Sequence, residues 1–395
     1  MSGAPLRVLM ITSEWASDPG HTAHFIARQV RFLRAAGVDV DVFSFRGGRR
    51  PLRYLAAWAR LRRRLMERNG EGRPRYDLVH AQFGQSGLLA LPKRLPLVVT
   101  FRGDDLFGIL GRDGRPTAAG RLLQWLSRRV ARRADAAILV SEHLKEYLSR
   151  SAPVHIVPSG LDLDLFRCIP QEEACRHLGL SPDRRRVLFV GDPADPRKRY
   201  ALARQAVDVL HRTMPAELVI GWRLPHDQMP FYMSACDALV FTSREEGSPN
   251  AVKEALACDL PVVSVAVADV PLRLRGIPGC EVCADDSPET IAAALERTLQ
   301  RHARSEGRGR EAACQLDERL LTGRVIDIYR SVLPGASGHQ CNTHLCNAAT
   351  TRDQELRAHP RRNHRLRGGL GDRSSSYGFC DGDPSCTHGN APWQR

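Results

Sequence analysis

The sequence alternates short apolar, β-branched runs with longer amphipathic stretches over most of its length. The apolar runs occupy residues 6–12, 38–45, 76–81, 96–101 and 136–140, and then 187–191, 216–222, 238–242 and 261–267. Amphipathic helices are expected between them, for example from about His24 to Ala36 and from about Tyr200. Strands that alternate with helices form parallel sheets covered on both faces, so this order predicts an α/β protein with doubly wound sheets.

The alternation stops and restarts once, which predicts two consecutive domains. We expect a Rossmann-like N-terminal domain over 1–155 and a Rossmann-like C-terminal domain over 156–334, with 155–166 as the crossing segment. The last helix is free to pack back on the first domain. Residues 335–395 are rich in Gly, Ser, His and Arg and follow neither period, so we predict a disordered or aberrant tail.

The composition limits the cellular location of the protein and the chemical class of its binding partners. The apolar runs are too short to span a bilayer, and the first residues lack a signal-peptide pattern, so we expect a cytoplasmic protein. The 58 Lys and Arg residues outnumber the 44 Asp and Glu residues, for a net charge of +14, which predicts anionic partners. No nucleic-acid-binding motif accompanies this charge, so nucleic acid is not an expected partner. A lone CxxC at Cys280 and Cys283 has no second pair at zinc spacing, and we predict no metal site.

The stretch REEGSPNAVKEALACDLPVVS, residues 244–264, sets Glu246 and Glu254 around a turn. Ser248 can cap a helix and Pro249 suits its first position, so residues 250–258 are predicted to be helical, between strands 238–242 and 261–267. The turn then lies at the carboxyl end of a strand, where open α/β sheets bind ligands, and the helix start offers free amides to a phosphate. A surface loop with ordinary solvated charges fits the spacing equally well.

This stretch resembles the glutamate-x7-glutamate motif of the retaining GT-B glycosyltransferases of the family 4, or group 1, type. The general form E-G-x-P-N-x-x-x-E-A-x-A-C-x-x-P-V-V-S is matched here by EGSPNAVKEALACDLPVVS. Other segments agree in order with the family: RVLMITSEW, YDLVHAQ, VVTFRGDDL, LVSEHLKEYL, IVPSGLDLDLF and FVGDPADPRKRY. The resemblance covers residues 6–333.

The resemblance implies two Rossmann-like domains facing across a cleft, with a nucleotide-diphosphate sugar on the C-terminal domain. Glu246 would contact the donor sugar and Glu254 the ribose hydroxyls, while Lys198 would neutralise the diphosphate, so that Glu246 and Lys198 are the catalytic pair. Further donor-binding residues would be Gly247, Ser248, Asn250, Ala251, Val252 and Arg197. The family retains anomeric configuration, and neither a metal nor another cofactor is expected.

On the acceptor side, the resemblance points to cleft residues of the N-terminal domain, namely Gly20, His80, Arg102 and Asp104. His80 at a strand end fits core packing as well as cleft lining. Arg102 replaces a family histidine and supplies a fixed cation that could bind a phosphate. Asp192 replaces the arginine of the phosphate loop, so either Asp192 turns away or Arg197 or Arg199 substitutes for the missing cation.

Residues 50–75 hold nine arginines and two glutamates around Leu52, Leu55, Trp58 and other apolar residues. A solvated helix face explains this pattern. The same pattern is also explained if the segment Arg50 to Arg75 makes peripheral contact with an anionic membrane that carries a lipid-linked acceptor.

The function expected from these features is transfer of a sugar from a UDP- or GDP-sugar to a glycan or lipid-linked acceptor, in polysaccharide or glycolipid synthesis. Two alternatives remain at this stage. One is a nucleotide-sugar-binding protein without turnover, which the Asp192 and Arg102 replacements would allow. The other is a nucleotide-sugar 2-epimerase of the same architecture, although epimerases lack the EGSPN-x3-E pattern.

Overall fold

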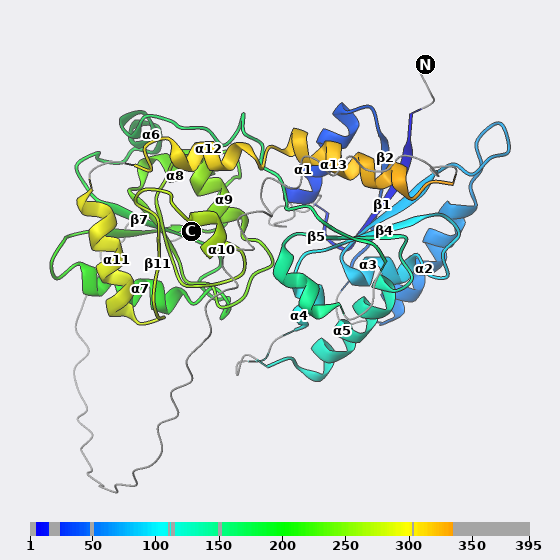
Figure 1. Cartoon of the computed structure of the whole chain (residues 1–395), viewed down its shortest axis with the longest axis horizontal. Helices are drawn as coiled ribbons and strands as arrows, with labels where there is room; N and C mark the ends of the chain where they lie inside the picture. Colours follow the sequence, from blue (N-terminus) through cyan, green and yellow to red (C-terminus); the bar gives the residue numbers. More distant parts are fainter. Residues whose placement is uncertain are drawn as a thin grey trace, which may run out of the picture. The chain divides into compact units, whose positions relative to one another are not determined.

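The computed structural model describes residues 5–15, 24–47, 51–109, 111, 115–148, 152–301 and 304–334. Gly20, Arg50 and the tail over 335–395 lie outside the described residues, so the predictions made for them stay predictions. Within this part of the chain the structure contains two parallel sheets with helices around them (Figure 1). The predicted α/β class with two doubly wound sheets is therefore confirmed.

The first sheet has six parallel strands in the order β2-β1-β3-β4-β5-β6. The strands are β1 Arg7–Thr12, β2 Asp39–Ser44, β3 Leu78–Gln82, β4 Leu97–Phe101, β5 Ala136–Leu139 and β6 Val154–Ile156. The helices between them are α1 His24–Ala35, α2 Pro51–Met66, α3 Gly84–Leu89, α4 Asp104–Phe107, α5 Ala118–Ala131 and the 3-10 helix η1 Glu142–Tyr147. Part of the predicted crossing segment is thus an edge strand, because Val154 to Ile156 pair with β5.

Alternate residues of each strand point to opposite faces, which explains the continuous apolar runs. In β1, Leu9 and Ile11 pack into a cluster with α2, α3 and α5, whereas Val8 and Met10 pack against α1 on the other face. All four side chains have no exposed surface. A strand covered on both faces needs apolar residues at every position, and the sequence LRVLMIT supplies them.

The second sheet has five parallel strands in the order β11-β10-β9-β7-β8. The strands are β7 Arg186–Val190, β8 Glu217–Gly221, β9 Ala238–Phe241, β10 Val262–Ser264 and β11 Glu281–Val282. The helices are α6 Gln171–Leu178, α7 Tyr200–Leu210, α8 Met229–Ala235, α9 Asn250–Ala257, α10 Val270–Leu274, α11 Pro288–Gln300 and α12 Arg308–Cys314. Strand β10 is shorter than the predicted run 261–267, since ladder pairing with β9 covers only Val262 to Ser264.

The last described helix, α13 (Glu318–Ser331), contributes to the core of the first sheet although it follows the second sheet in sequence (Figure 1). Its Leu321, Val325 and Tyr329 are buried in one cluster with Val30 and Leu33 of α1. The chain therefore passes from the first sheet to the second and returns.

Candidate functional site

The second sheet has its topological switch point between β7 and β9. From β7 the chain moves outward to β8, and from β9 it moves outward to β10 on the other side. The loops that leave the carboxyl ends of two such strands diverge, and the crevice between them is where open α/β sheets bind ligands. Lys198 lies in the loop after β7 and Glu246 in the loop after β9. The topology alone brings the two predicted catalytic residues to one place.

Lys198 and Glu246 form an ion pair at this switch point. The Lys198 Nζ atom lies 2.5 Å from Glu246 Oε1, and the two side chains are 24% and 18% exposed. The Thr242 hydroxyl fixes the Lys198 loop by donating to the Lys198 carbonyl at 2.8 Å. The stem of Lys198 also lies against Gly191, where an added Cβ would come within 3.1 Å of Lys198 Cγ. A cation and a carboxylate are thus held side by side, each partly open to solvent.

Helix α9 begins at Asn250, with Pro249 at the N-cap position and no side-chain cap. The predicted cap, Ser248, was wrong: its hydroxyl donates instead to Asp269 Oδ2 at 2.9 Å. The first amides of α9 are therefore not satisfied by a capping side chain, which is the condition under which a helix start can accept an anion. These amides belong to the predicted donor-binding residues Asn250, Ala251 and Val252.

The loop of Glu246 is in backbone contact with the first half of the chain through Gly247. A Cβ added at Gly247 would lie 1.7 Å from the Arg102 carbonyl oxygen, and one added at Gly103 would lie 3.0 Å from Gly247 Cα. The Ser141 hydroxyl donates to the Gly247 carbonyl at 2.6 Å. Positions 247 and 103 both require glycine because the two backbones meet there. At position 103 the backbone φ of 123° is a further reason, since glycine adopts such angles without strain.

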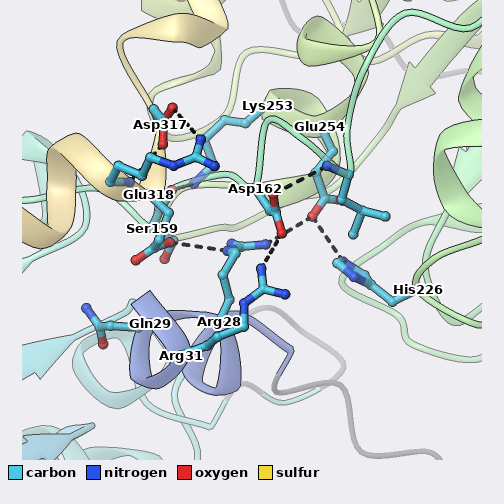
Figure 2. A network of polar contacts seen from close by, with 12 residues as sticks. Arg28, Gln29, Arg31, Ser159, Asp162, His226, Lys253, Glu254, Asp317 and Glu318 are labelled. Carbon is cyan, nitrogen blue, oxygen red and sulfur yellow. Dashed lines mark hydrogen bonds and ion pairs between the residues drawn. The ribbon is translucent and has the colours of Figure 1, made fainter. Parts of the chain in front are cut away.

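Glu254 lies in the second turn of α9 and is 7% exposed. Its Oε1 atom lies 3.5 Å from His226 Nε2 and 4.0 Å from Arg28 Nη1 (Figure 2). Burial opposes ionisation of this carboxyl group, but His226 and Arg28 outweigh burial and hold the pKa of Glu254 below its ordinary value. Glu254 is therefore an acceptor-only carboxylate at neutral pH, which is compatible with its predicted contact with ribose hydroxyls.

Several polar residues around Glu254 were missed by the sequence analysis. Arg28 Nε donates to Glu318 Oε2 at 3.2 Å, and Lys253 Nζ donates to the Ser159 carbonyl at 3.0 Å (Figure 2). These side chains come from α1, α13 and α9 and from the segment between the sheets. Only Lys253 had a signal in the sequence, since it precedes Glu254 in the motif and is one of four lysines in the chain.

The predicted cleft residues of the first half fall into different environments. Arg102 is partly buried: its guanidinium donates to Gln82 Oε1 at 2.8 Å and to Ser159 Oγ at 2.6 Å, and burial lowers the pKa of Arg102 to about 10. Asp104 is exposed and accepts from Arg197 Nη1 at 2.6 Å. Asp105, its neighbour, is buried and shapes the loop by accepting from three backbone amides, those of Gly84, Arg102 and Gly103.

His80 belongs to the core. It has no exposed surface, its Nδ1 lies 2.6 Å from the Tyr329 hydroxyl, and its Nε2 lies 2.7 Å from Thr100 Oγ1. Burial lowers the pKa of His80 to about 3, so the ring is neutral. Of the two interpretations left open by the sequence, the structure corresponds to core packing, because Tyr329 of α13 covers this strand.

The structure also shows where the replaced phosphate-loop residue points. Asp192 Oδ1 accepts from the Ala194 amide at 2.9 Å, which folds Asp192 into its own loop. Arg197 contacts Asp195 and Asp104, and Arg199 donates to the Thr242 carbonyl and to Asp286. Lys198 is thus the residue of this loop that faces Glu246.

No group of three or more His, Cys, Asp or Glu side chains among the described residues is arranged to hold a metal ion. The Asp162 and Asp164 carboxylates of the connecting segment pair with Arg31 and Arg319. In the described part of the chain, no helix has the length and apolar character needed to cross a bilayer.

Sequence comparison gives two family matches. Glycosyltransferase Family 4 matches residues 1–165, and Glycosyl transferases group 1 matches residues 173–301. Among curated relatives, D-inositol 3-phosphate glycosyltransferase 1 of Catenulispora acidiphila is 26% identical over 313 residues, which cover 67% of this chain and 74% of the relative. A putative teichuronic acid biosynthesis glycosyltransferase, TuaC of Bacillus subtilis, is 26% identical over 218 residues, covering 49% and 54% of the two chains.

Solved structures show the same fold at lower identity. Sucrose-phosphate synthase from Thermosynechococcus elongatus superposes with a TM-score of 0.69 at 17% identity, covering 82% of this chain and 98% of the other. Anabaena Alr3699/HepE in complex with UDP-glucose superposes with a TM-score of 0.62 at 16% identity, covering 82% and 100%. With both halves matched in order and the two-sheet GT-B fold in place, the chain belongs to the glycosyltransferases of the family 4, group 1 type.

Proposed function

We propose that this glycosyltransferase moves a sugar, with retention of anomeric configuration, from a UDP- or GDP-sugar to a glycan or lipid-linked acceptor in polysaccharide or glycolipid synthesis. The observation that carries the proposal is the Lys198–Glu246 pair at the switch point, beside the uncapped start of α9. A nucleotide-diphosphate sugar has an anion and a set of hydroxyl groups close together, and this site has a cation with free amides next to a carboxylate.

The proposed mechanism depends on where negative charge develops during sugar transfer. Cleavage of the sugar–phosphate bond leaves negative charge on the diphosphate, and donors fixed in advance at that position lower the barrier. Lys198 and the α9 amides supply such donors, and Glu246 would orient the sugar through its hydroxyl groups. In a retaining reaction by front-face attack, the departing phosphate oxygen takes the proton of the acceptor hydroxyl. Fixed positive charge on the protein would replace a metal ion in this mechanism.

The comparisons support the choice of donor and acceptor classes to be tested. The HepE structure holds UDP-glucose, which favours a uridine nucleotide. The two relatives are named for D-inositol 3-phosphate, a phosphorylated polyol, and for teichuronic acid biosynthesis. Phosphorylated polyols therefore belong in an acceptor screen together with glycans and lipid-linked sugars.

We further propose a cytoplasmic enzyme with peripheral contact to anionic membrane through the segment around α2. Leu52, Leu55 and Met66 on this helix are 77%, 61% and 54% exposed, among arginines. Apolar side chains at the centre of a basic helix face suit the boundary between headgroups and acyl chains. Co-sedimentation with phosphatidylglycerol vesicles checks this: Leu52→Glu combined with Leu55→Glu is expected to abolish binding, and equal binding of the variant would exclude α2 as the contact.

The experiment that tests the main proposal measures nucleotide release by the full-length protein. UDP- and GDP-sugars are screened with EDTA present and with extracted lipids, glycans and polyol phosphates as acceptors. We expect one donor to give release and a transfer product of retained anomeric configuration by NMR. Glu246→Ala should lower the rate by about 10²–10³-fold, whereas Glu245→Ala, its neighbour in the same loop, should lower it by less than about fivefold.

Each alternative function has its own signature in this assay. Tight binding of a nucleotide sugar without release, in the presence of every acceptor, would indicate a binding protein without turnover. A donor whose sugar changes configuration at C2 would indicate an epimerase. Release that needs added divalent cation would exclude the metal-free mechanism.

A further inference from the structure

Arg28 is a buried arginine that contacts two buried carboxylates, with the cations Lys253 and Arg102 also nearby. It lies on α1, is 6% exposed, and contacts Glu318 at 3.2 Å and Glu254 at 4.0 Å (Figure 2). Its Nη2 atom is buried and has no hydrogen-bond partner. A guanidinium held away from water with donors unused costs folding free energy, so optimal stability does not explain this arrangement.

The two carboxylates belong to different parts of the protein. Glu254 lies on α9, one turn beyond the helix start that faces the switch point, and Glu318 lies at the start of α13, which packs with α1. Glu318 is anchored by its own backbone amide, which donates to the Leu161 carbonyl at 2.8 Å. Arg28 lies on α1, which packs on the first sheet, and its ion pair with Glu318 holds the guanidinium with Nη1 toward Glu254.

Without Arg28, two buried carboxylates would lose their shared cation. Burial raises the pKa of Glu318, and the pKa of Glu254 is kept low by His226 first and then by Arg28 and Lys253. Lys253 makes its hydrogen bond to a backbone carbonyl and not to Glu254. Removing Arg28 is therefore expected to raise the pKa of Glu254 and to leave the carboxylate held from one side only, by His226.

We propose that Arg28 is a positioning residue for the donor: from the first half of the chain it holds the Glu254 carboxylate oriented for the ribose hydroxyls. This inference rests on the proposed function and on the ribose contact that the family resemblance implies for Glu254. It adds that nucleotide binding on the second sheet depends on a side chain of α1, and so on contact between the two halves of the chain.

Calorimetric titration of UDP and of GDP into the full-length protein at pH 8 tests the inference. For the nucleotide that the wild-type protein binds, Arg28→Leu is expected to weaken affinity by about tenfold at pH 8, a usual coupling for contacting residues. Arg28→Lys keeps the charge and should restore part of the lost affinity, which a purely structural role for the guanidinium would not predict. Arg31→Ala, one turn along α1 and paired with Asp162, is the matched control and should change affinity by less than about twofold.

A double variant separates positioning from a general effect on the fold. If Arg28 acts through Glu254, Arg28→Leu with Glu254→Gln binds the nucleotide no more weakly than Glu254→Gln alone. Independent losses that multiply in the double variant, or an Arg28→Leu affinity equal to wild type, would overturn the inference and leave the proposed function standing. Wild-type protein that binds neither nucleotide would overturn both.

Discussion

The two glutamates of the motif are eight residues apart, but the protein builds their surroundings in different ways. Glu246 is paired with Lys198, and both belong to loops of the second sheet. Glu254 is paired with His226 of the same half and with Arg28 of α1, which packs on the first sheet. The pair assigned to the reacting end of the donor is therefore built within one sheet, and the carboxylate assigned to the ribose is completed by the other half of the chain.

This difference predicts that substitutions at Glu246 and its partner Lys198 lower kcat, whereas substitutions around Glu254 weaken nucleotide affinity. The strongest effect is expected for Lys198→Ala, which removes the cation proposed to neutralise the developing diphosphate charge. We expect kcat to fall by about 10²–10³-fold, with a smaller change in the donor KM. Lys145→Ala, in which an exposed lysine paired with Glu142 is removed, is the control and should be close to wild type. A Lys198 variant that loses donor affinity at full kcat would place the lysine outside the reacting end.

The contact between the halves at Gly247 offers a second test, with a smaller expected effect. Gly247→Ala would place a methyl group 1.7 Å from the Arg102 carbonyl oxygen, so the two backbones must separate. Because Glu246 precedes Gly247, we expect kcat/KM to fall by about 10²-fold, in line with the effect of a 1 Å misplacement in an active site.

Gly323→Ala is a matched control for this substitution. Gly323 lies within α13, and an added Cβ there meets no atom within 4 Å, so alanine should be neutral or slightly stabilising. Equal activity of the Gly247 and Gly323 variants would show that this contact between the halves is dispensable for turnover.

Much of the fold was predictable because it depends on local pattern. Apolar runs covered on both faces, such as the one containing Leu9 and Met10, identify strands by composition alone, and the motif places α9 within one residue of its observed end. The pairing of Lys198 with Glu246 could also be predicted, since both residues follow strands whose carboxyl ends lie at the same edge of the sheet. The role of Ser248 was not, because its partner Asp269 lies 21 residues further along the chain.

The surroundings of Glu254 could not be predicted for a related reason. Arg28 looks like an ordinary charged residue of an amphipathic helix, and nothing in its local sequence shows that its neighbours are Glu254 and Glu318. His80 is the converse case: it follows the pattern of a strand-end ligand, but α13 returns to cover it with Tyr329. Contacts made by a helix that returns from the far end of the chain leave no signal in the residues they cover.

The smallest expected effect concerns Lys253, the buried neighbour of Glu254, and tests whether the surroundings of Glu254 reduce stability. Lys253 is 1% exposed, its hydrogen bond goes to the Ser159 carbonyl, and burial lowers the pKa of Lys253 to about 7. A buried cation without a carboxylate hydrogen-bond partner reduces stability, so Lys253→Met, of similar size, should raise Tm by about 2–4 °C at pH 7.

The direction in which the stability difference between wild type and Lys253→Met changes with pH follows from the pKa of Lys253 in the folded and unfolded states. The unfolded chain keeps the lysine proton up to about pH 10, whereas the folded protein releases it near pH 7. Between these values the unfolded state binds more protons, so wild-type stability rises with pH through this group, and the variant lacks that rise. The Tm advantage of Lys253→Met should therefore be largest at pH 7 and below and shrink toward pH 10 in melts followed by circular dichroism. A variant that is less stable than wild type at pH 7 would mean that Lys253 stabilises the junction at Ser159, and the region around Glu254 would then be built for stability as well as for binding.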